Sequence, residues 1–343
     1  MSRKILAMLA AIALVAAACG SSSDTAEAPS TTLSTTTTTA TSTTVAASST
    51  TNPTTTSPTT TTSSTTVLEP SGFPVTIDAP NGPVTIEKQP ENIVSLSPTS
   101  TEALFAVGAG PQVVAVDNQS NYPAEAPMTE LTGFEPNLEA IAGYGADLVV
   151  IMYDPGDVIT GLEAIGIPVI MHPSATTLDD TYMQIDQIGA ATGHVDEASR
   201  LVASMRTEIA AAIASTDGGG ATYYHELSPD YYSVTSATFV GALYTMLDLE
   251  NIADGSDPDG YGYPQLSAEH ILSEDPDMMF LADTKCCDQD AATVAGRPGW
   301  DTLTAVQEGA ITELDDDIAS RWGPRVVDFV ASIAEAIAEF QSS

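Results

Sequence analysis

In the region that begins near residue 73, short hydrophobic stretches alternate with stretches in which hydrophobic residues recur at helical spacing. The stretches 75–77 and 84–86 flank Asn81-Gly82, which predicts a small hairpin. Strands are expected at 92–96, 113–116, 148–152 and 169–171. Helices are expected at 101–107, 138–142 and 158–165. Continuous apolar strands that alternate with helices indicate a parallel sheet covered on both faces.

The middle of the chain carries no strand pattern between residues 177 and 215. It predicts two helices, 178–191 and 195–215, separated at Gly193, and the second is about 30 Å long at about 1.5 Å per residue. The strand pattern then resumes. Further strands are expected at 221–224, 232–235, 278–281 and 310–314, and further helices at 239–247 and 324–340.

This order of elements predicts an α/β fold of two Rossmann-like lobes joined by one long backbone helix. The folded domain is expected over 69–343. Within it, lobe one takes about 73–176, the bridging helices about 177–216 and lobe two about 221–343. Ligands of open α/β sheets bind at the carboxyl ends of the strands, so a ligand cleft is expected between the lobes.

The first residues have the layout of an export signal. Arg3 and Lys4 precede an apolar run at 5–18, which is short for a membrane-spanning helix because such a helix needs about 20 residues. We therefore expect residues 1–18 to be a signal peptide that is removed. Cys19 follows small residues and resembles the lipidated cysteine of bacterial lipoproteins, which would anchor the chain to the membrane. The alternative is an ordinary secretory signal with a coincidental cysteine.

Residues 19–68 are expected to form a disordered tether. Between residues 30 and 66, 29 of 37 residues are Ser or Thr, and none is charged or aromatic. Such a stretch cannot bury enough apolar surface to offset its conformational entropy. The tether would hold the domain near the membrane and leave it free to turn.

The net charge of the chain excludes some classes of binding partner. The chain carries 9 Lys+Arg and 46 Asp+Glu, which gives a formal net charge of −37. Nucleic acid and anionic membrane surfaces need basic patches, so neither is expected as a main partner. The three cysteines are too few for a fold that depends on disulfides.

Sequence motifs of enzymes are missing. The chain has no Gly-x-Ser-x-Gly elbow, no phosphate loop and no His-Glu-x-x-His helix. The acidic run 315–317 lacks the ligand spacing of a calcium loop and is expected to be a solvated face. We therefore expect no enzyme activity, no cofactor and no metal site.

Several motifs together resemble a known family, the helical-backbone substrate-binding proteins of iron-siderophore, haem and cobalamin ABC importers. They occur in the family's order at 90–104 (PENIVSLSPTSTEAL), 136–141 (PNLEAI), 146–150 (ADLVV), 275–281 (DPDMMFL), 297–300 (RPGW) and 322–328 (WGPRVVD). The resemblance implies two small α/β lobes bridged by a long helix. It also implies an extracytoplasmic monomer that binds a small molecule and delivers it to a permease with its ATPase.

In relatives, one glutamate on each lobe meets arginines of the permease. The resemblance places these residues at Glu139, in 137–141 (NLEAI), and Glu269, in 266–271 (LSAEHI). Bidentate contacts between Arg and carboxylate would supply the geometric specificity. The alternative is that both carboxylates are merely solvated.

The choice of ligand rests on charge. Seven basic residues remain after the signal peptide: Lys88, Arg200, Arg206, Lys285, Arg297, Arg321 and Arg325. A strongly anionic ferric chelate would be repelled unless an Arg cluster offset the negative charge. Cobalamin or a related corrinoid, which is large, amphipathic and rich in amides, fits better. A ferric siderophore or haem on the same fold is the alternative.

The candidate walls of the cleft are mainly aromatic, because aromatic rings give large contact areas at small entropic cost. His225 is interpreted as a wall residue that forms hydrogen bonds, with axial ligation of cobalt or haem iron as the alternative. The candidate ligand-binding residues are Thr99, Tyr122, Tyr153, His225, Tyr231, Cys286, Cys287, Arg321 and Trp322.

Cys286 and Cys287 are adjacent in a chain that is expected to be exported to an oxidising compartment. With Cys19 lipidated, they can pair with each other or with another molecule. A vicinal disulfide is expected, as an apolar platform facing the cleft. A Cys-Cys loop followed by RPGW also resembles the cobalamin-type branch of the family. If the pair is reduced, copper or zinc binding is a minor alternative.

Overall fold

The computed structural model describes residues 72–343. The predicted signal peptide, Cys19 and the predicted tether lie outside the described residues. Among residues 72–343, no helix is both long and apolar enough to cross a lipid bilayer.

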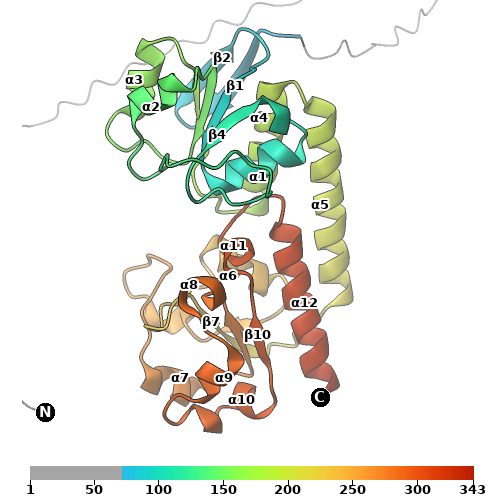
Figure 1. Cartoon of the computed structure of the whole chain (residues 1–343). Coiled ribbons are helices and arrows are strands. Elements are labelled where there is room, and N and C mark those ends of the chain that lie inside the picture. The colour runs from blue at the N-terminus through green and yellow to red at the C-terminus, as the bar shows by residue number, and fades with distance from the viewer. Residues whose placement is uncertain (1–71) are drawn as a thin grey trace, which may run out of the picture. The chain divides into compact units, whose positions relative to one another are not determined.

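Lobe one contains a hairpin and a parallel sheet (Figure 1). The hairpin pairs β1 (Val75–Ala79) with β2 (Gly82–Ile86). The sheet has the order β4-β3-β5-β6, from β3 (Ile93–Leu96), β4 (Val113–Val116), β5 (Leu148–Ile151) and β6 (Val169–Met171). Its helices are α1 (Pro98–Ala106), α2 (Leu138–Gly143), α3 (Val158–Ala164) and α4 (Leu178–Thr192).

Lobe two contains a second parallel sheet, of order β10-β9-β7-β8. Its strands are β7 (Thr222–Glu226), β8 (Glu250–Asn251), β9 (Met278–Leu281) and β10 (Ile311–Glu313). Its helices are α6 (Phe239–Thr245), α7 (Ala268–Glu274), α8 (Thr284–Cys287), α9 (Ala291–Ala295), α10 (Thr304–Gln307) and α11 (Asp316–Ala319).

The two sheets share one strand order. In each, the first strand in sequence (β3 or β7) lies between the second and the third, and the fourth follows the third at the edge. All pairings within both sheets are parallel. The chain therefore runs from the first strand to a neighbour on one side and then crosses to the other side, which creates a crevice at the carboxyl end of the first strand. Each lobe has one such switch point.

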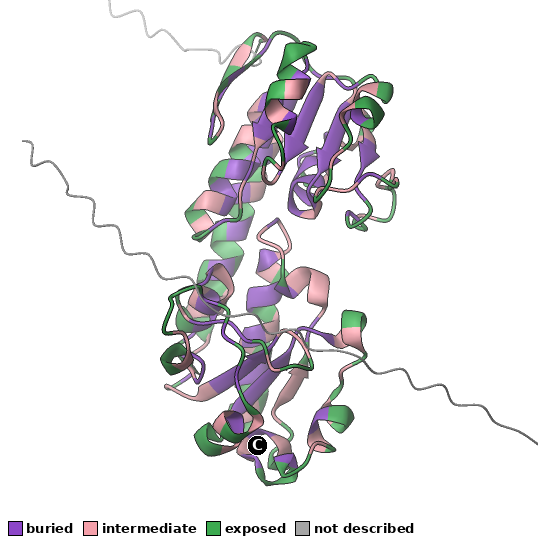
Figure 2. Cartoon of the chain, turned by 90° about the vertical axis from the view of Figure 1, so that its left-hand side faces the viewer, coloured by how far each residue is buried: buried purple, intermediate pink, exposed green. Residues whose placement is uncertain are grey.

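One long helix connects the lobes. Figure 1 shows α5 (Val195–Ser215) running from lobe one to lobe two, with α12 (Val326–Ser342) beside it. The apolar faces of both helices join one hydrophobic core that extends from the lobe-one sheet to the lobe-two sheet. In Figure 2 the central strands of both sheets are buried, and β3, β5 and β9 are buried throughout. The predicted class, two α/β lobes joined by a long helix, is confirmed.

Helix α4 does not bridge the lobes, although the sequence grouped it with α5. It packs against α1 and β1 of lobe one and ends at Gly193, whose φ of 82° is left-handed. Glycine adopts this conformation without the steric cost that other residues incur. The chain reverses there, so α4 and α5 pack side by side.

The strand predicted at 232–235 is wrong. The backbone N–H groups of Ser233 and Thr235 donate to the carbonyls of Pro264 and Gly262 in a neighbouring loop, so this segment joins neither sheet. Only an isolated bridge between Tyr232 and Gln265 remains. The short elements β8 and α7 to α11 were not predicted, because segments of two to seven residues show little periodicity.

Shortening a buried side chain on α12 tests the continuous core. Ile333 is fully buried and belongs to that core, so Ile333→Ala should lower the free energy of unfolding by about 2–5 kcal/mol. The measurement is urea denaturation followed by circular dichroism. Glu335→Ala, at an exposed position on the same helix, should change it by no more than about 0.5 kcal/mol. Equal effects of the two changes would contradict the packing.

Candidate functional site

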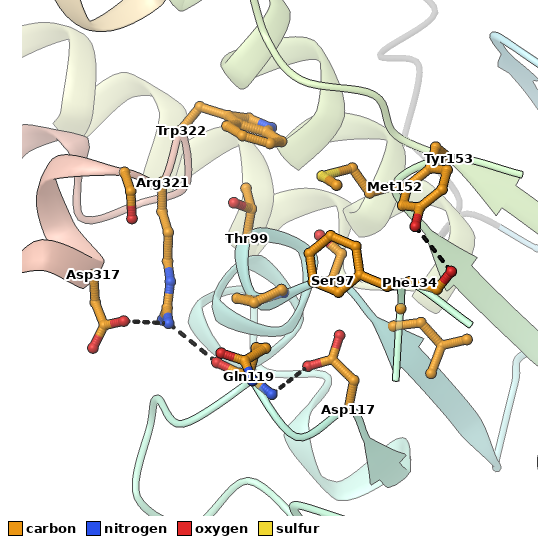
Figure 3. Close-up of a pocket in the computed structure, with 14 residues that line it drawn as sticks. Ser97, Thr99, Asp117, Gln119, Phe134, Met152, Tyr153, Asp317, Arg321 and Trp322 are labelled. Carbon is orange, nitrogen blue, oxygen red and sulfur yellow. Dashed lines mark hydrogen bonds and ion pairs between the residues drawn. The ribbon is translucent and has the colours of Figure 1, made fainter. Parts of the chain in front are cut away.

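A cavity of about 260 Å³ lies between lobe one and the segment that leads into α12 (Figure 3). Its lobe-one walls follow the carboxyl ends of β3, β4 and β5, which is the switch point of this sheet. The opposite wall comes from α11 and the turn after it. The lining residues used below are Ser97, Thr99, Asp117, Gln119, Phe134, Met152, Tyr153, Asp317, Arg321 and Trp322.

The start of α1 forms the polar part of the lobe-one wall. Ser97 is extended and its Oγ accepts a hydrogen bond from the Ser100 N–H, which caps the helix, and Pro98 occupies the first turn. Pro is favourable there because the first helical N–H groups have no partner within the helix. This cap holds Thr99 against the cavity.

Aromatic side chains line two sides of the cavity. The hydroxyl of Tyr153 donates to the Phe134 carbonyl at 3.1 Å, and the two rings are 6.3 Å apart. Phe134 is 64% exposed, which leaves its ring free for contact with a ligand. Across the cavity, Nε1 of Trp322 donates to Oε1 of Gln184 at 3.2 Å. The rings thus offer apolar faces at fixed positions.

Arg321 is the only lysine or arginine among the described residues that line the cavity, and both terminal nitrogens of its guanidinium group donate hydrogen bonds to the protein. Nη1 donates to Glu102 Oε1 at 2.8 Å, and Nη2 donates to Asp317 Oδ1 at 2.6 Å. Nη2 also donates to the Gln119 carbonyl and to Asn121 Oδ1. The charge of Arg321 is therefore balanced by carboxylates of the protein.

Asp117 adds a carboxyl group to the same cavity. It is buried, and burial raises the pKa of this carboxyl above its usual value. The hydrogen bond from the Gln119 N–H lowers the pKa, but its effect is smaller than that of burial. The cavity therefore presents hydroxyls, a carboxyl group and aromatic faces. It offers no unpaired positive charge on the described residues.

The structure brings together four of the predicted ligand-binding residues, Thr99, Tyr153, Arg321 and Trp322. Tyr122 and Tyr231 do not line this cavity. Tyr122 lies under the Arg325 guanidinium, 4.1 Å from the ring centroid, beside a separate hollow. Tyr231 stacks on Trp300 with ring centroids 5.7 Å apart.

The prediction for His225 is wrong. Its side chain is fully buried in lobe two, where Nδ1 forms a 2.8 Å hydrogen bond with the Tyr244 hydroxyl. Burial lowers the pKa of this imidazole to about 3, so it is neutral. The reason lies in the sheet: both faces of a parallel sheet are covered, so a side chain near a strand end can point into the core. His225 is neither a cleft wall nor available as an axial ligand.

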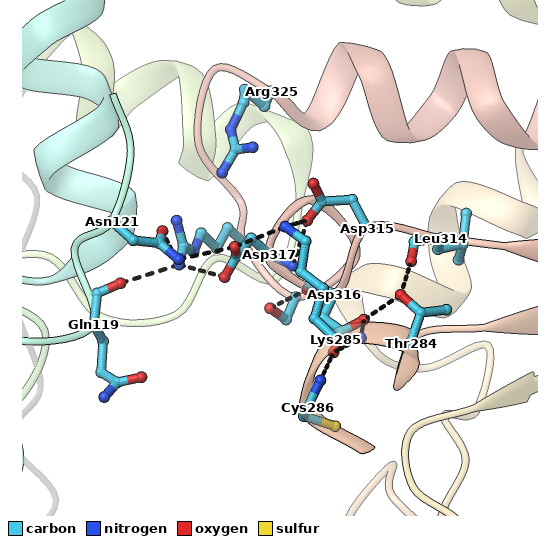
Figure 4. Close-up of polar contacts among 12 residues, drawn as sticks. Gln119, Asn121, Thr284, Lys285, Cys286, Leu314, Asp315, Asp316, Asp317 and Arg325 are labelled. Atoms are coloured by element: carbon cyan, nitrogen blue, oxygen red, sulfur yellow. Dashed lines mark hydrogen bonds and ion pairs between the residues drawn. The ribbon is translucent and has the colours of Figure 1, made fainter. Parts of the chain in front are cut away.

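Cys286 and Cys287 are joined by a disulfide in α8 but do not line the cavity. The segment 315–317 holds this helix in place (Figure 4). The Asp316 carboxylate accepts from the backbone N–H groups of Lys285 and Cys286, and Lys285 Nζ donates to Asp315 and Asp317. The prediction that 315–317 is merely a solvated acidic face is wrong, because these carboxylates connect α8 to Arg321.

Sequence reasoning missed several residues of the cavity. Three of them lie at or just after the end of a predicted strand, and that position could have identified them. Asp117 and Gln119 follow the strand predicted at 113–116, and Met152 is the last residue of the strand predicted at 148–152. Phe134 lies in an irregular loop and carried no such signal. Glu102 does not line the cavity but pairs with Arg321, and its position inside a helix gave no signal of that role.

In lobe two, charged side chains occupy the corresponding strand ends. Glu226 ends β7 and accepts two hydrogen bonds from Arg297, each 2.6 Å long. Asp283, just after β9, is buried, and neither of its oxygens has a partner among the described residues. Burial and the neighbouring Glu226 carboxylate raise the pKa of Asp283 to about 7. This switch point is filled by protein side chains rather than open.

The raised pKa of Asp283 predicts a pH effect on stability. The unfolded carboxyl has a pKa of about 3.9, so between about pH 4 and 7 the unfolded chain loses its proton first and the folded state becomes relatively less stable as pH rises. Asp283→Asn cannot ionise. Its melting temperature relative to the unaltered protein should therefore be higher at pH 8 than at pH 4.5, measured by calorimetry. The exposed control Asp301→Asn should show a constant difference, and a constant difference for both variants would contradict the assignment.

The described residues contain no cluster of three or more His, Cys, Asp or Glu side chains arranged to hold a metal ion.

The two predicted docking glutamates occupy matching places in the two lobes. Glu139 lies in the first turn of α2, capped by Asn137, and Glu269 lies in the first turn of α7, capped by Ser267. Both are exposed. Figure 1 shows α2 and α7 on the same side of the two lobes. The helices thus present one carboxylate per lobe to solvent.

Comparisons with known proteins agree with this architecture. Residues 93–318 match the family described as periplasmic binding protein. An uncharacterized ABC transporter substrate-binding lipoprotein of Bacillus subtilis is 32% identical, over 77% of this chain and 86% of the relative. A cobalamin-binding protein of Halobacterium salinarum is 31% identical, over 77% of this chain and 74% of the relative. A crystal structure from Saccharomonospora viridis, described as an ABC-type Fe3+-hydroxamate transport system, has a TM-score of 0.59 and 25% identity, and the match covers 77% of this chain and 99% of that one.

The chain belongs to the periplasmic binding protein family, and it is an extracytoplasmic substrate-binding protein of an ABC transporter. Such proteins bind solutes and work with a permease and its ATPase; they are not enzymes. The family resemblance that the sequence motifs carried is confirmed.

Proposed function

We propose that this protein captures cobalamin or a related corrinoid and delivers it to its permease. The observation that carries the proposal is the balanced charge of the cavity, where Arg321 is paired with Glu102 and Asp317. A site without a free cation favours a ligand that carries little net charge, since burying an unpaired anion there is costly. The similarity to the cobalamin-binding protein of Halobacterium salinarum supports the same ligand.

The lining chemistry suits a flat molecule ringed with amides. Phe134, Tyr153 and Trp322 offer faces for an apolar ring system. Thr99 and the carboxyl of Asp117 can accept hydrogen bonds from amide N–H groups. At about 260 Å³ the cavity is smaller than the roughly 300–1,000 Å³ of pockets that enclose drug-sized ligands. It would receive one part of a corrinoid, and the remainder would extend between the lobes.

A ferric siderophore or haem is the second candidate. A neutral ferric hydroxamate meets the same charge requirement, and the crystal structure from Saccharomonospora viridis supports this class. Haem has a separate argument, because Met152 and Tyr153 both line the cavity and both residue types serve as axial ligands of haem iron.

Calorimetric titration of the 69–343 domain with cyanocobalamin, haem and a neutral ferric hydroxamate tests the proposal. Cyanocobalamin should bind with a Kd below about 1 μM, and the other two should bind at least about tenfold more weakly. Trp322→Ala should raise the Kd for cyanocobalamin at least about tenfold, because it removes an aromatic face of the cavity. Tyr144→Ala, an exposed aromatic outside the cavity, is the control and should leave it unchanged. Tight binding of haem or hydroxamate alone would refute the corrinoid.

We further propose that Cys19 carries the lipid anchor and that Glu139 and Glu269 contact the permease. Their matching positions on capped helices of the two lobes support a two-point contact with permease arginines.

Reversing the docking charges should separate binding from transport. Glu139→Lys/Glu269→Lys should abolish uptake of labelled ligand by cells and leave the calorimetric Kd of the isolated domain unaltered, because both residues lie outside the cavity. Glu163→Lys/Glu335→Lys makes the same charge change at other exposed positions and should leave uptake intact. Unchanged uptake in the first variant would argue against docking through these residues.

A further inference from the structure

Glu102 is the buried centre of a charge cluster that joins two distant parts of the chain. It lies on α1 of lobe one, and its side chain is only 2% exposed. Oε1 accepts from Arg321 Nη1 at 2.8 Å and from Arg325 Nη2 at 2.6 Å, and Oε2 accepts from Arg325 Nε at 3.0 Å. One carboxylate thus meets two guanidinium groups from the segment that leads into α12.

The charges of the cluster balance. Two carboxylates, Glu102 and Asp317, face two guanidinium groups, Arg321 and Arg325. Lys285, which is paired with both Asp317 and Asp315, extends the cluster by one charge of each sign, so the sum stays zero. Asn121 completes the arrangement, because its Nδ2 donates to Asp317 Oδ2 and its Oδ1 accepts from Arg321. The part of the cluster that the cavity meets is Arg321 and Asp317, both labelled in Figure 3.

The hydrogen bonds of Arg321 also fix the orientation of its guanidinium group. One terminal nitrogen donates to Glu102, and the other terminal nitrogen donates to Asp317, Asn121 and the Gln119 carbonyl. A planar guanidinium group offers five N–H donors in a fixed fork. With both terminal nitrogens held by the protein, Arg321 cannot turn toward a ligand anion without giving up contacts inside a buried cluster.

We propose that Glu102 is a specificity-determining residue: it neutralises Arg321 and Arg325 and thereby excludes anionic ligands from the cavity. Glu102 does not line the cavity; it acts through Arg321, so it is a positioning residue. The inference rests on the proposed function in that it explains why this site takes a cargo of little net charge.

Removing the charge of Glu102 makes the cluster beside the cavity more positive by one unit. Attraction between unlike charges is stronger in a partly buried site than in water, because the effective dielectric constant is lower. Glu102→Gln keeps the size of the side chain and one oxygen acceptor. Its expected effect is a gain of about tenfold or more in affinity for an anionic ferric chelate, and that gain should weaken as salt concentration rises.

The experiment measures Kd for ferric citrate, for a ferric tris-catecholate and for cyanocobalamin, with the unaltered domain and with Glu102→Gln. Affinity for both anions should rise in the variant, and affinity for cyanocobalamin should fall severalfold because Trp322 and Arg321 lose a positional restraint. The matched control is Glu102→Gln/Arg325→Gln, which restores the charge balance. It should return the anion affinities toward those of the unaltered domain.

Asp317→Asn provides a second route if Glu102→Gln does not fold. The Asp317 side chain is 22% exposed, and its loss frees Arg321 from the other side. It should also raise the affinity for both anions. If neither variant gains anion affinity while circular dichroism shows a folded protein, the proposal is overturned.

The two proposals fail separately. A domain that does not bind cyanocobalamin refutes the corrinoid as cargo. The comparison of anion affinities between the unaltered domain and the variants still decides the role of Glu102, because it requires no knowledge of the native cargo.

Discussion

The pairing of one buried carboxylate with two guanidinium groups governs the shape of the cleft. A buried ion that lacks a partner costs several kcal/mol, so Glu102, Arg321 and Arg325 must meet. The pairs join residues 219 and 223 positions apart in the chain. This requirement brings the segment before α12 against α1, and with it Trp322 against the cavity that Thr99 also lines. The cavity is therefore a consequence of an ion cluster as much as of the two sheets.

The shared strand order of the two lobes makes their difference informative. Both sheets create a crevice at the carboxyl end of their first strand. In lobe one this crevice lines the cavity, whereas in lobe two Glu226 and Arg297 fill it with a doubly hydrogen-bonded ion pair. Lobe one thus provides most of the residues that line the cavity. The opposite wall comes from α11 and the turn before α12.

The sequence predicted most of the fold because long apolar runs and helical periodicity are local signals. The strands at 113–116 and 169–171 agree with the structure at both ends, and the long helix at 195–215 does as well. The candidate site was harder. Thr99 and Tyr153 could be predicted from their places after strands, but the burial of His225 depends on which face of β7 it occupies and on α6 packing there. Glu102 looked like any helical glutamate, because its partners lie more than 200 positions away.

The net charge of the whole chain and the charges around the cavity affect ligand binding in different ways. Composition gives a chain of formal charge −37 with few cations, which argued against anionic ligands through long-range repulsion. Salt screens such repulsion beyond about 8–10 Å, so at physiological ionic strength it says little about the cavity itself. What acts at short range is the arrangement around Arg321, where two carboxylates of the protein hold a cation that would otherwise attract an anion. On the proposed role of Glu102, selectivity against anions depends on how one cation is paired, and a surface of any net charge could surround the same cavity.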